Sequence, residues 1–142
     1  MFLIESYKSI GPVFLDVPIS EIEKVLGKTD IKVSKYFADE EIGMYSNGIA
    51  VSYHEKLSSF IGVLISLKPV HEDFHFLNKN YNEVLEYFNS HPGNIYLEDK
   101  TSLFSEYLGI TVYFEDGIKE VGTISKNYIK FHITNLELYN KS

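Results

Sequence analysis

The spacing of apolar residues along the chain predicts two short amphipathic helices. The apolar positions of the first recur at the spacing of one helix face and are Ile19, Ile22, Val25 and Leu26. Pro18 stands where a first helical turn tolerates proline, and Gly27 stands where helices commonly end. This helix is expected over about residues 18–27. In the second helix the same spacing recurs at Tyr81, Val84, Leu85 and Phe88, and it ends at His91-Pro92-Gly93.

Alternating or continuous apolar runs after each helix predict strands. After the first helix these runs are Ile31–Val33 with Phe37, Ile42–Tyr45, Ile49–Tyr53 and Phe60–Ile65. After the second helix they are Ile95–Leu97, Leu103–Phe104, Ile110–Phe114 and Ile118–Ile124. Asp116-Gly117, just before the last of these runs, is typical of a hairpin turn. A closing strand is expected at Tyr128–Ile133.

The order of these elements indicates an internal repeat. Phe14-Leu15-Asp16 precedes the first helix and Phe76-Leu77-Asn78 precedes the second, an offset of 62 residues (76 − 14). Further along, Gly62 and Gly122 match at an offset of 60 (122 − 62). Chance similarity of two amphipathic stretches is the alternative, and order and spacing favour a duplication. We expect one domain of residues 1–142, with repeat units of about residues 10–66 and 67–133.

These elements predict the fold class α+β. Two tandem helix-then-antiparallel-strand units would form one domain, with the helices on one face of the sheet and water on the other. Because side chains alternate between the faces of a strand, inward Ile110 and Val112 would leave Tyr113 pointing outward. The same rule predicts outward positions for Tyr36, Tyr96, Glu98 and Glu115.

Composition narrows the class of partner. The chain of 142 residues carries a formal net charge of −7, which disfavours nucleic acid and anionic membranes because phosphate binding needs a basic surface. A basic protein is the better match. The 11 Tyr and 10 Phe exceed what a core of this size readily absorbs, so some tyrosines are expected at the surface. Without cysteine there is no disulfide, thiolate metal site or thiol nucleophile.

The sequence shows no pattern of membrane insertion. Its start, Met1-Phe2-Leu3-Ile4-Glu5, has too short an apolar run for a signal peptide and an acid where a base is expected. No stretch approaches the ~18 apolar residues of a spanning helix. A cytoplasmic protein is therefore expected.

One segment matches a known catalytic motif. His71-Glu72-Asp73-Phe74-His75 has the form H-E-x-x-H, in which a helix presents two imidazoles to Zn²⁺ and the glutamate acts as a general base. The extended motif would need glycine at Asn78 and histidine at Tyr81, and neither is present. The repeat aligns the segment with Gly11-Pro12-Val13-Phe14, which cannot lie inside a helix, so both histidines are expected in a solvated linker. A small zinc metallohydrolase using this segment is the enzymatic alternative.

No other pattern predicts catalysis. His54, His91 and His132 are scattered, and the serines have no nucleophile-elbow motif. The glycines are isolated and form no phosphate-binding loop. We therefore expect no enzyme, and assign no catalytic residue, cofactor or metal from the sequence.

An acidic run, Asp39-Glu40-Glu41, lies between two predicted strands. Its simplest interpretation is a charged hairpin loop, and the same charges would steer a cationic partner. Tyrosines beside acids have the composition of binding surfaces, because tyrosine gives rigid contact area at low entropic cost. An ordinary acidic surface is the alternative.

Three segments together resemble a known class of proteins: Gly11–Asp16, Ile19–Gly27 and Tyr45–Tyr53. Their order is similar to that in small bacterial immunity proteins of polymorphic-toxin and contact-dependent-inhibition loci, and the paired units are similar in plan to β-lactamase inhibitor proteins. The resemblance implies a cytoplasmic protein that binds and neutralises a cognate toxin, often a basic nuclease, without chemistry of its own.

The surface that such a partner would contact is predicted from outward register and charge. The expected contact residues are Tyr36, Asp39, Glu40, Glu41, Tyr96, Glu98, Tyr113 and Glu115. A scaffold or oligomerisation module without a toxin partner is the remaining alternative.

Overall fold

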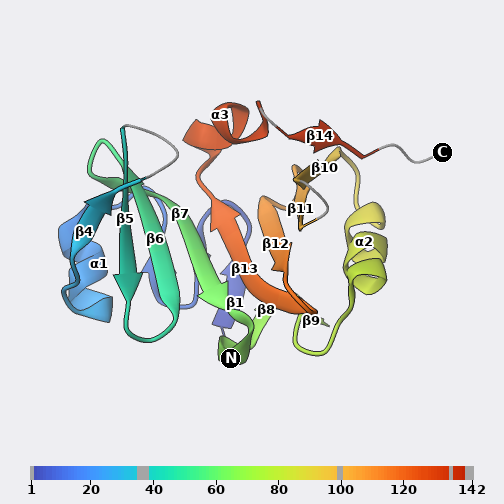
Figure 1. Ribbon diagram of the computed structural model, residues 1–142, viewed down its shortest axis with the longest axis horizontal. Helices are drawn as coiled ribbons and strands as arrows, with labels where there is room; N and C mark the ends of the chain where they lie inside the picture. The colour runs from blue at the N-terminus through green and yellow to red at the C-terminus, as the bar shows by residue number, and fades with distance from the viewer. Residues whose placement is uncertain (1, 35–38, 99–100, 135, 140–142) are drawn as a thin grey trace.

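The computed structural model describes residues 2–34, 39–98, 101–134 and 136–139, which form a mostly β protein with two sheets. Figure 1 shows α1 and α2 near opposite ends of the larger sheet, with β1 and β8 between them and α3 across its upper end. Tyr36 and Phe37, which the sequence places on or beside a strand, lie outside the described residues.

The larger sheet has nine strands in the order β14-β10-β11-β12-β13-β7-β6-β5-β4. One antiparallel meander consists of β4 (Ile31–Val33), β5 (Glu40–Tyr45), β6 (Ile49–His54) and β7 (Leu57–Leu64). The other consists of β10 (Ile95–Glu98), β11 (Ser102–Ser105), β12 (Ile110–Phe114) and β13 (Ile118–Ile124), with β14 (Glu137–Leu138) on its edge. The meanders meet at β7 and β13, where Gly62 pairs with Gly122.

The smaller sheet has five strands in the order β3-β2-β1-β8-β9. Its strands are β1 (Phe2–Glu5), β2 (Ser9–Ile10), β3 (Val13–Phe14), β8 (Pro69–His71) and β9 (Phe74–His75). β1 and β8 pair in parallel, which joins the start of the chain to its middle. The smaller sheet packs on the centre of the larger one, and its buried Ile4, Ile10 and Val13 share a core with Ile61 and Val121.

The helices are short. α1 (Ile19–Leu26) begins after Pro18 and ends at Gly27, whose φ of 82° favours glycine. α2 (Tyr81–Asn89) begins with a capping box, in which the Asn80 side chain accepts from the Glu83 N–H and the Glu83 carboxylate accepts from the Asn80 N–H. The others are α3 (Ile129–Ile133) and the 3-10 turns η1 (Ile65–Leu67) and η2 (Lys126–Tyr128). No helix in the described ranges is long and apolar enough to span a bilayer.

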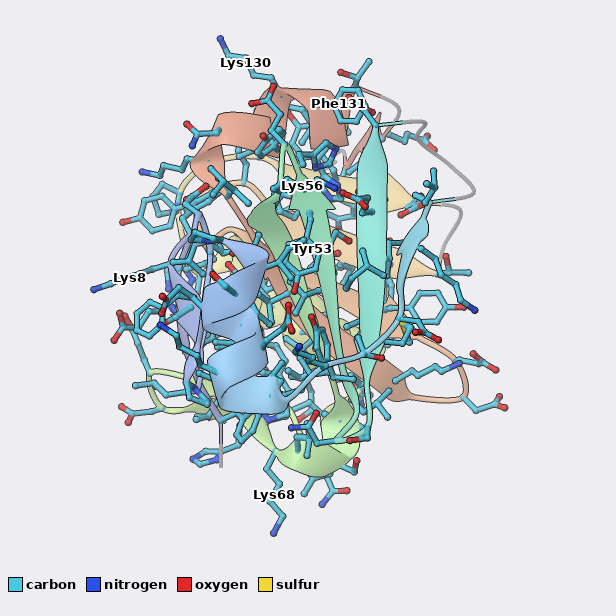
Figure 2. All side chains as sticks on the ribbon, turned by 90° about the vertical axis from the view of Figure 1, so that its left-hand side faces the viewer. Lys8, Tyr53, Lys56, Lys68, Lys130 and Phe131 are labelled. Carbon is cyan, nitrogen blue, oxygen red and sulfur yellow. The ribbon has the colours of Figure 1, made fainter. Side chains whose placement is uncertain are left out.

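The larger sheet has a buried face and a partly exposed one. Along β6, Ile49, Val51 and Tyr53 lie on the buried face, which we term the core face and which α1, α2 and the smaller sheet cover. Figure 2 shows Tyr53 beside α1. The hydroxyl groups of Tyr53 and Tyr45 are 2.6 Å apart there, so the buried phenols satisfy each other. Alternate residues, such as Ser52, lie on the opposite face, which we term the open face.

The predicted fold class is wrong, although most of its elements are confirmed. Both expected helices and the eight strand segments between Ile31 and Ile124 are present, apart from Phe37. The chain is nevertheless mostly β, with a second sheet that the sequence pattern did not predict. Tyr128–Ile133 is not a strand but the end of η2 followed by α3. Since α3 packs on the open face, the helices do not share one face of the sheet.

Candidate binding surface

The H-E-x-x-H segment forms a hairpin and not a helix. In β8 and β9, His71 pairs with Phe74 and Val70 pairs with His75, so the two histidines point to opposite faces of the hairpin. His71 is buried, which lowers its pKa, and its Nδ1 and Nε2 lie 2.6 Å and 3.1 Å from the hydroxyls of Tyr87 and Ser6.

The structure therefore gives this segment a packing role. The predicted solvated linker is wrong for His71, which is buried in β8 of the smaller sheet, whereas His75 in β9 is exposed. Within residues 2–34, 39–98, 101–134 and 136–139, no three His, Cys, Asp or Glu side chains are grouped to hold a metal.

Strand registers align one row of side chains across the open face. Each residue in this row pairs with the next residue of the row on the neighbouring strand. We term it the Glu120 row, and it consists of Leu64, Glu120, Tyr113, Ser102 and Glu98. Leu64, Tyr113 and Glu98 are exposed, while Ser102 is buried. The row therefore presents apolar, aromatic and acidic groups side by side on an otherwise regular sheet.

The seam between β7 and β13 shapes the centre of this face. A Cβ at Gly62 would lie 2.7 Å from Oε1 of Glu120, and a Cβ at Gly122 would lie 2.4 Å from Cζ of Phe60. The Glu120 carboxylate and the Phe60 ring therefore lie across the seam, each above the glycine of the opposite strand. Burial there raises the pKa of Glu120.

Glu120→Gln is expected to stabilise the fold increasingly as pH rises. The folded-state pKa of Glu120 lies above its usual 4.5, so the unfolded chain releases this proton at a lower pH than the folded chain does. The wild type thus loses stability as pH rises from the unfolded pKa to the folded pKa, whereas the glutamine variant does not. Urea denaturation from acidic to neutral pH measures this difference. A variant no more stable than wild type at neutral pH would contradict it, and Glu98→Gln in the same row is the exposed control.

Four of the expected contact residues lie at the β10–β12 end of the sheet. Tyr96 and Glu98 are on the open face of β10, and the Tyr96 hydroxyl donates to Glu106 Oε1 at 3.0 Å. Tyr113 is 37% exposed on the same face. Glu115 follows β12 and forms an ion pair with Lys119 at 2.8 Å. These four residues form a surface of tyrosines and acids.

The acidic run lies at the opposite end of the sheet. Asp39 is an exposed turn residue, and Glu40 lies on the open face opposite His54 in the register. Glu41 points the other way and pairs with Lys56 at 2.7 Å. Six strand spacings separate β5 from β10, about 29 Å along the sheet. The described contact residues therefore form two groups instead of one patch, and the remaining one, Tyr36, lies outside the described residues.

Comparison with known proteins finds no matching family, no similar curated protein and no similar solved structure. The resemblance to immunity proteins accordingly stays a prediction.

Sequence reasoning missed a cavity of about 170 Å³ between the open face and the η2–α3 segment. It is lined by Glu40, Ser52, His54, Ser59, Phe60, Ile124, Tyr128, Phe131 and His132. The alternation along β6 indicates that Ser52 and His54 share the outward side, which is the one signal available from sequence. This alternation gives no indication that residues 126–133 cover Ser52 and His54.

The cavity contains a serine and a histidine in contact, but their geometry does not suit nucleophilic catalysis. Ser59 Oγ lies 2.8 Å from His54 Nδ1 and donates to the carbonyl of Ser52 at 3.2 Å. A nucleophilic serine must reach a substrate and pass its proton to the base. Ser59 is 2% exposed, so its hydroxyl is not open to a substrate in this structure.

Proposed function

We propose that this protein is a non-enzymatic, cytoplasmic immunity protein that binds a toxin domain with a basic contact surface and neutralises it through the open face of its larger sheet. The observation that carries the proposal is the Glu120 row. It holds a partly buried carboxylate at the centre of the face, with exposed Leu64 and Tyr113 on either side.

The physical properties of this row match those of binding hot spots. Tyrosine buries a large area at small entropic cost, and a charged pair in a desolvated position contributes more than one at the rim. The Glu120 carboxylate lies across the seam above Gly62, on the face that a partner would contact. Glu98 extends the negative charge to the rim, where it would accelerate encounter with a basic protein, while Glu115 is paired with Lys119.

The alternatives have less support in the geometry. A zinc hydrolase would need His71 and His75 on one side of a helix, and they lie on opposite faces of a hairpin. A scaffold or oligomerisation module would need an extended apolar surface, whereas the row mixes acids with its apolar groups.

Partner binding tests the proposal directly. Where the gene directly upstream encodes a toxin domain, co-expression with this protein is expected to restore growth, and the purified pair is expected to form a complex. Tyr113→Ala should weaken that complex by about 30-fold, because truncating a hot-spot residue costs about 2 kcal/mol. The matched control is Tyr107→Ala, which removes an exposed tyrosine from the β11–β12 turn.

Glu120→Gln separates binding from folding, because it is expected to raise stability while weakening the complex. A partner that binds both the Tyr113→Ala and the Glu120→Gln variants as tightly as wild type would contradict the proposed surface. An upstream gene that encodes a metabolic enzyme, together with no captured toxin, would contradict neutralisation itself.

A further inference from the structure

We propose that the cavity beneath α3 receives the guanidinium group of an arginine side chain from the partner. This inference rests on the proposed function for the source of the arginine. The cavity itself is a property of the free protein, formed by the sheet below and the η2–α3 segment above, and it can be tested without any partner.

The walls of the cavity are aromatic. The rings of His54 and Tyr128 are stacked with centroids 4.5 Å apart, and Phe131 meets His54 edge to face at 6.1 Å. Phe60 lies on the sheet side of the cavity, and an adjoining hollow of about 120 Å³ shares His54, Tyr128 and Phe131. Aromatic faces attract cations, and a planar guanidinium also stacks on them.

A buried ring nitrogen in this cavity, His54 Nε2, has no hydrogen-bond partner. Ser59 Oγ lies 3.2 Å from the Ser52 carbonyl and 2.8 Å from His54 Nδ1, and in the tautomer in which the Ser59 proton goes to the carbonyl, His54 Nδ1 donates to Ser59 Oγ. This tautomer leaves Nε2 as an acceptor. His54 is only 6% exposed, lines the cavity, and its Nε2 makes no hydrogen bond in the structure. A buried acceptor of this kind favours a ligand that donates.

Acidic side chains lie at the same place. Glu40 lines the main cavity and Asp39 lines the adjoining hollow. Within the described part of the chain, neither carboxylate forms an ion pair. The pKa of Tyr128 is raised, first by burial and then by the charges of Glu55, Asp16 and Asp39, so this ring faces a negative potential.

The nearby cations are directed elsewhere. Lys56 pairs with Glu41 on the other side of β5, and Lys126 lies over the ring of Tyr7. Figure 2 shows Lys130 pointing away from the molecule above α3, while Phe131 lies on the other side of that helix. The acidic cavity therefore has no internal counter-charge among these lysines.

The donor set favours arginine over other ligands. An anion would meet Glu40 and Asp39, and the described residues provide no group of three metal ligands. Glu40 on β5 and His54 on β6 come from neighbouring strands, and both line the cavity. A guanidinium has five N–H donors in one plane and can reach acceptors on several sides, whereas an ammonium is a compact point charge.

Binding of a small arginine derivative tests the site in the free protein. N-acetyl-arginine amide is expected to shift the NMR signals of His54, Tyr128 and Phe131 in a saturable manner, whereas N-acetyl-citrulline amide, equal in shape and uncharged, should not. Glu40→Gln should weaken arginine-amide binding by about tenfold or more, because it removes the charge from a charge-assisted hydrogen bond. The matched control is Glu41→Gln, one residue along the strand and pointing away from the cavity.

The outcomes distinguish this inference from the proposed function. Equal binding of the arginine and citrulline probes, binding of neither, or equal loss in Glu40→Gln and Glu41→Gln would overturn the guanidinium site. A toxin that binds Glu40→Gln as tightly as wild type would also overturn it, while leaving neutralisation supported. Arginine-amide binding that needs Glu40, with no neutralised partner, would support the site and count against the proposed function.

Discussion

Phe76→Ala is expected to lower the free energy of unfolding by about 3–5 kcal/mol, the range for truncating a fully buried phenylalanine. Phe76 has no exposed surface and belongs to the core shared by both sheets and by the helices on the core face. Its ring meets Phe74 edge to face, with centroids 4.9 Å apart. Alanine would leave a cavity where these elements meet, and rigid neighbours on several sides limit its collapse.

The matched control is Phe14→Ala. Phe14 is 45% exposed on β3, so its truncation is expected to cost less than about 1 kcal/mol. Urea denaturation of both variants provides the comparison, and Phe76→Leu, which keeps most of the apolar volume, should fall between them. Equal costs for Phe14→Ala and Phe76→Ala would contradict the different burial of the two rings.

Phe14 and Phe76 also show what the sequence pattern could not predict. The internal repeat aligns Phe14 with Phe76 and Leu15 with Leu77, which predicts similar environments. In the structure Phe76 and Leu15 are buried while Phe14 and Leu77 are exposed. The alignment compares order along the chain, but burial depends on which sheet the segment joins and on the direction from which it enters.

The longer elements were the easier ones to predict. α1, α2 and the longer strands of the two meanders show a repeating apolar pattern over enough residues to identify it. β2, β3 and β9 are two residues each, too short for any period, and the parallel pairing of β1 with β8 depends on residues far apart in the chain. The second sheet, and therefore the fold class, could not be derived from periodicity.

The closing segment was misassigned because its pattern fits two structures. Ile129, Phe131 and Ile133 alternate with polar residues, which is typical of a strand, yet Ile129 and Ile133 also share one helix face. The structure has a helix there, which covers Ser52 and His54 and creates the cavity. Alternation correctly predicted the outward face of Tyr113 and Glu98, whereas the cavity depends on this tertiary contact.

Gly122→Ala is expected to destabilise the fold by about 3 kcal/mol, the upper part of the range for overpacking a close-packed site. Neither seam glycine has a left-handed φ, so alanine introduces no backbone strain at either position. At Gly122 the new Cβ would lie 2.7 Å from the carbonyl oxygen of Ile61 as well as against the Phe60 ring. The ring can rotate, but the carbonyl belongs to the paired strand and moves only with the sheet.

Gly62→Ala is the matched control, because its Cβ would meet chiefly the end of the Glu120 side chain, which can move into water. Its cost is expected to be under about 1 kcal/mol, since alanine also reduces the entropy of the unfolded chain. Urea denaturation measures both, and a Gly122→Ala protein as stable as Gly62→Ala would contradict a Phe60 ring fixed across the seam. Because Phe60 also lines the cavity beneath α3, Gly122→Ala should weaken binding of N-acetyl-arginine amide more than Gly62→Ala, whose Cβ would lie 3.1 Å from Phe60 Cε1 but closer to the Glu120 carboxylate.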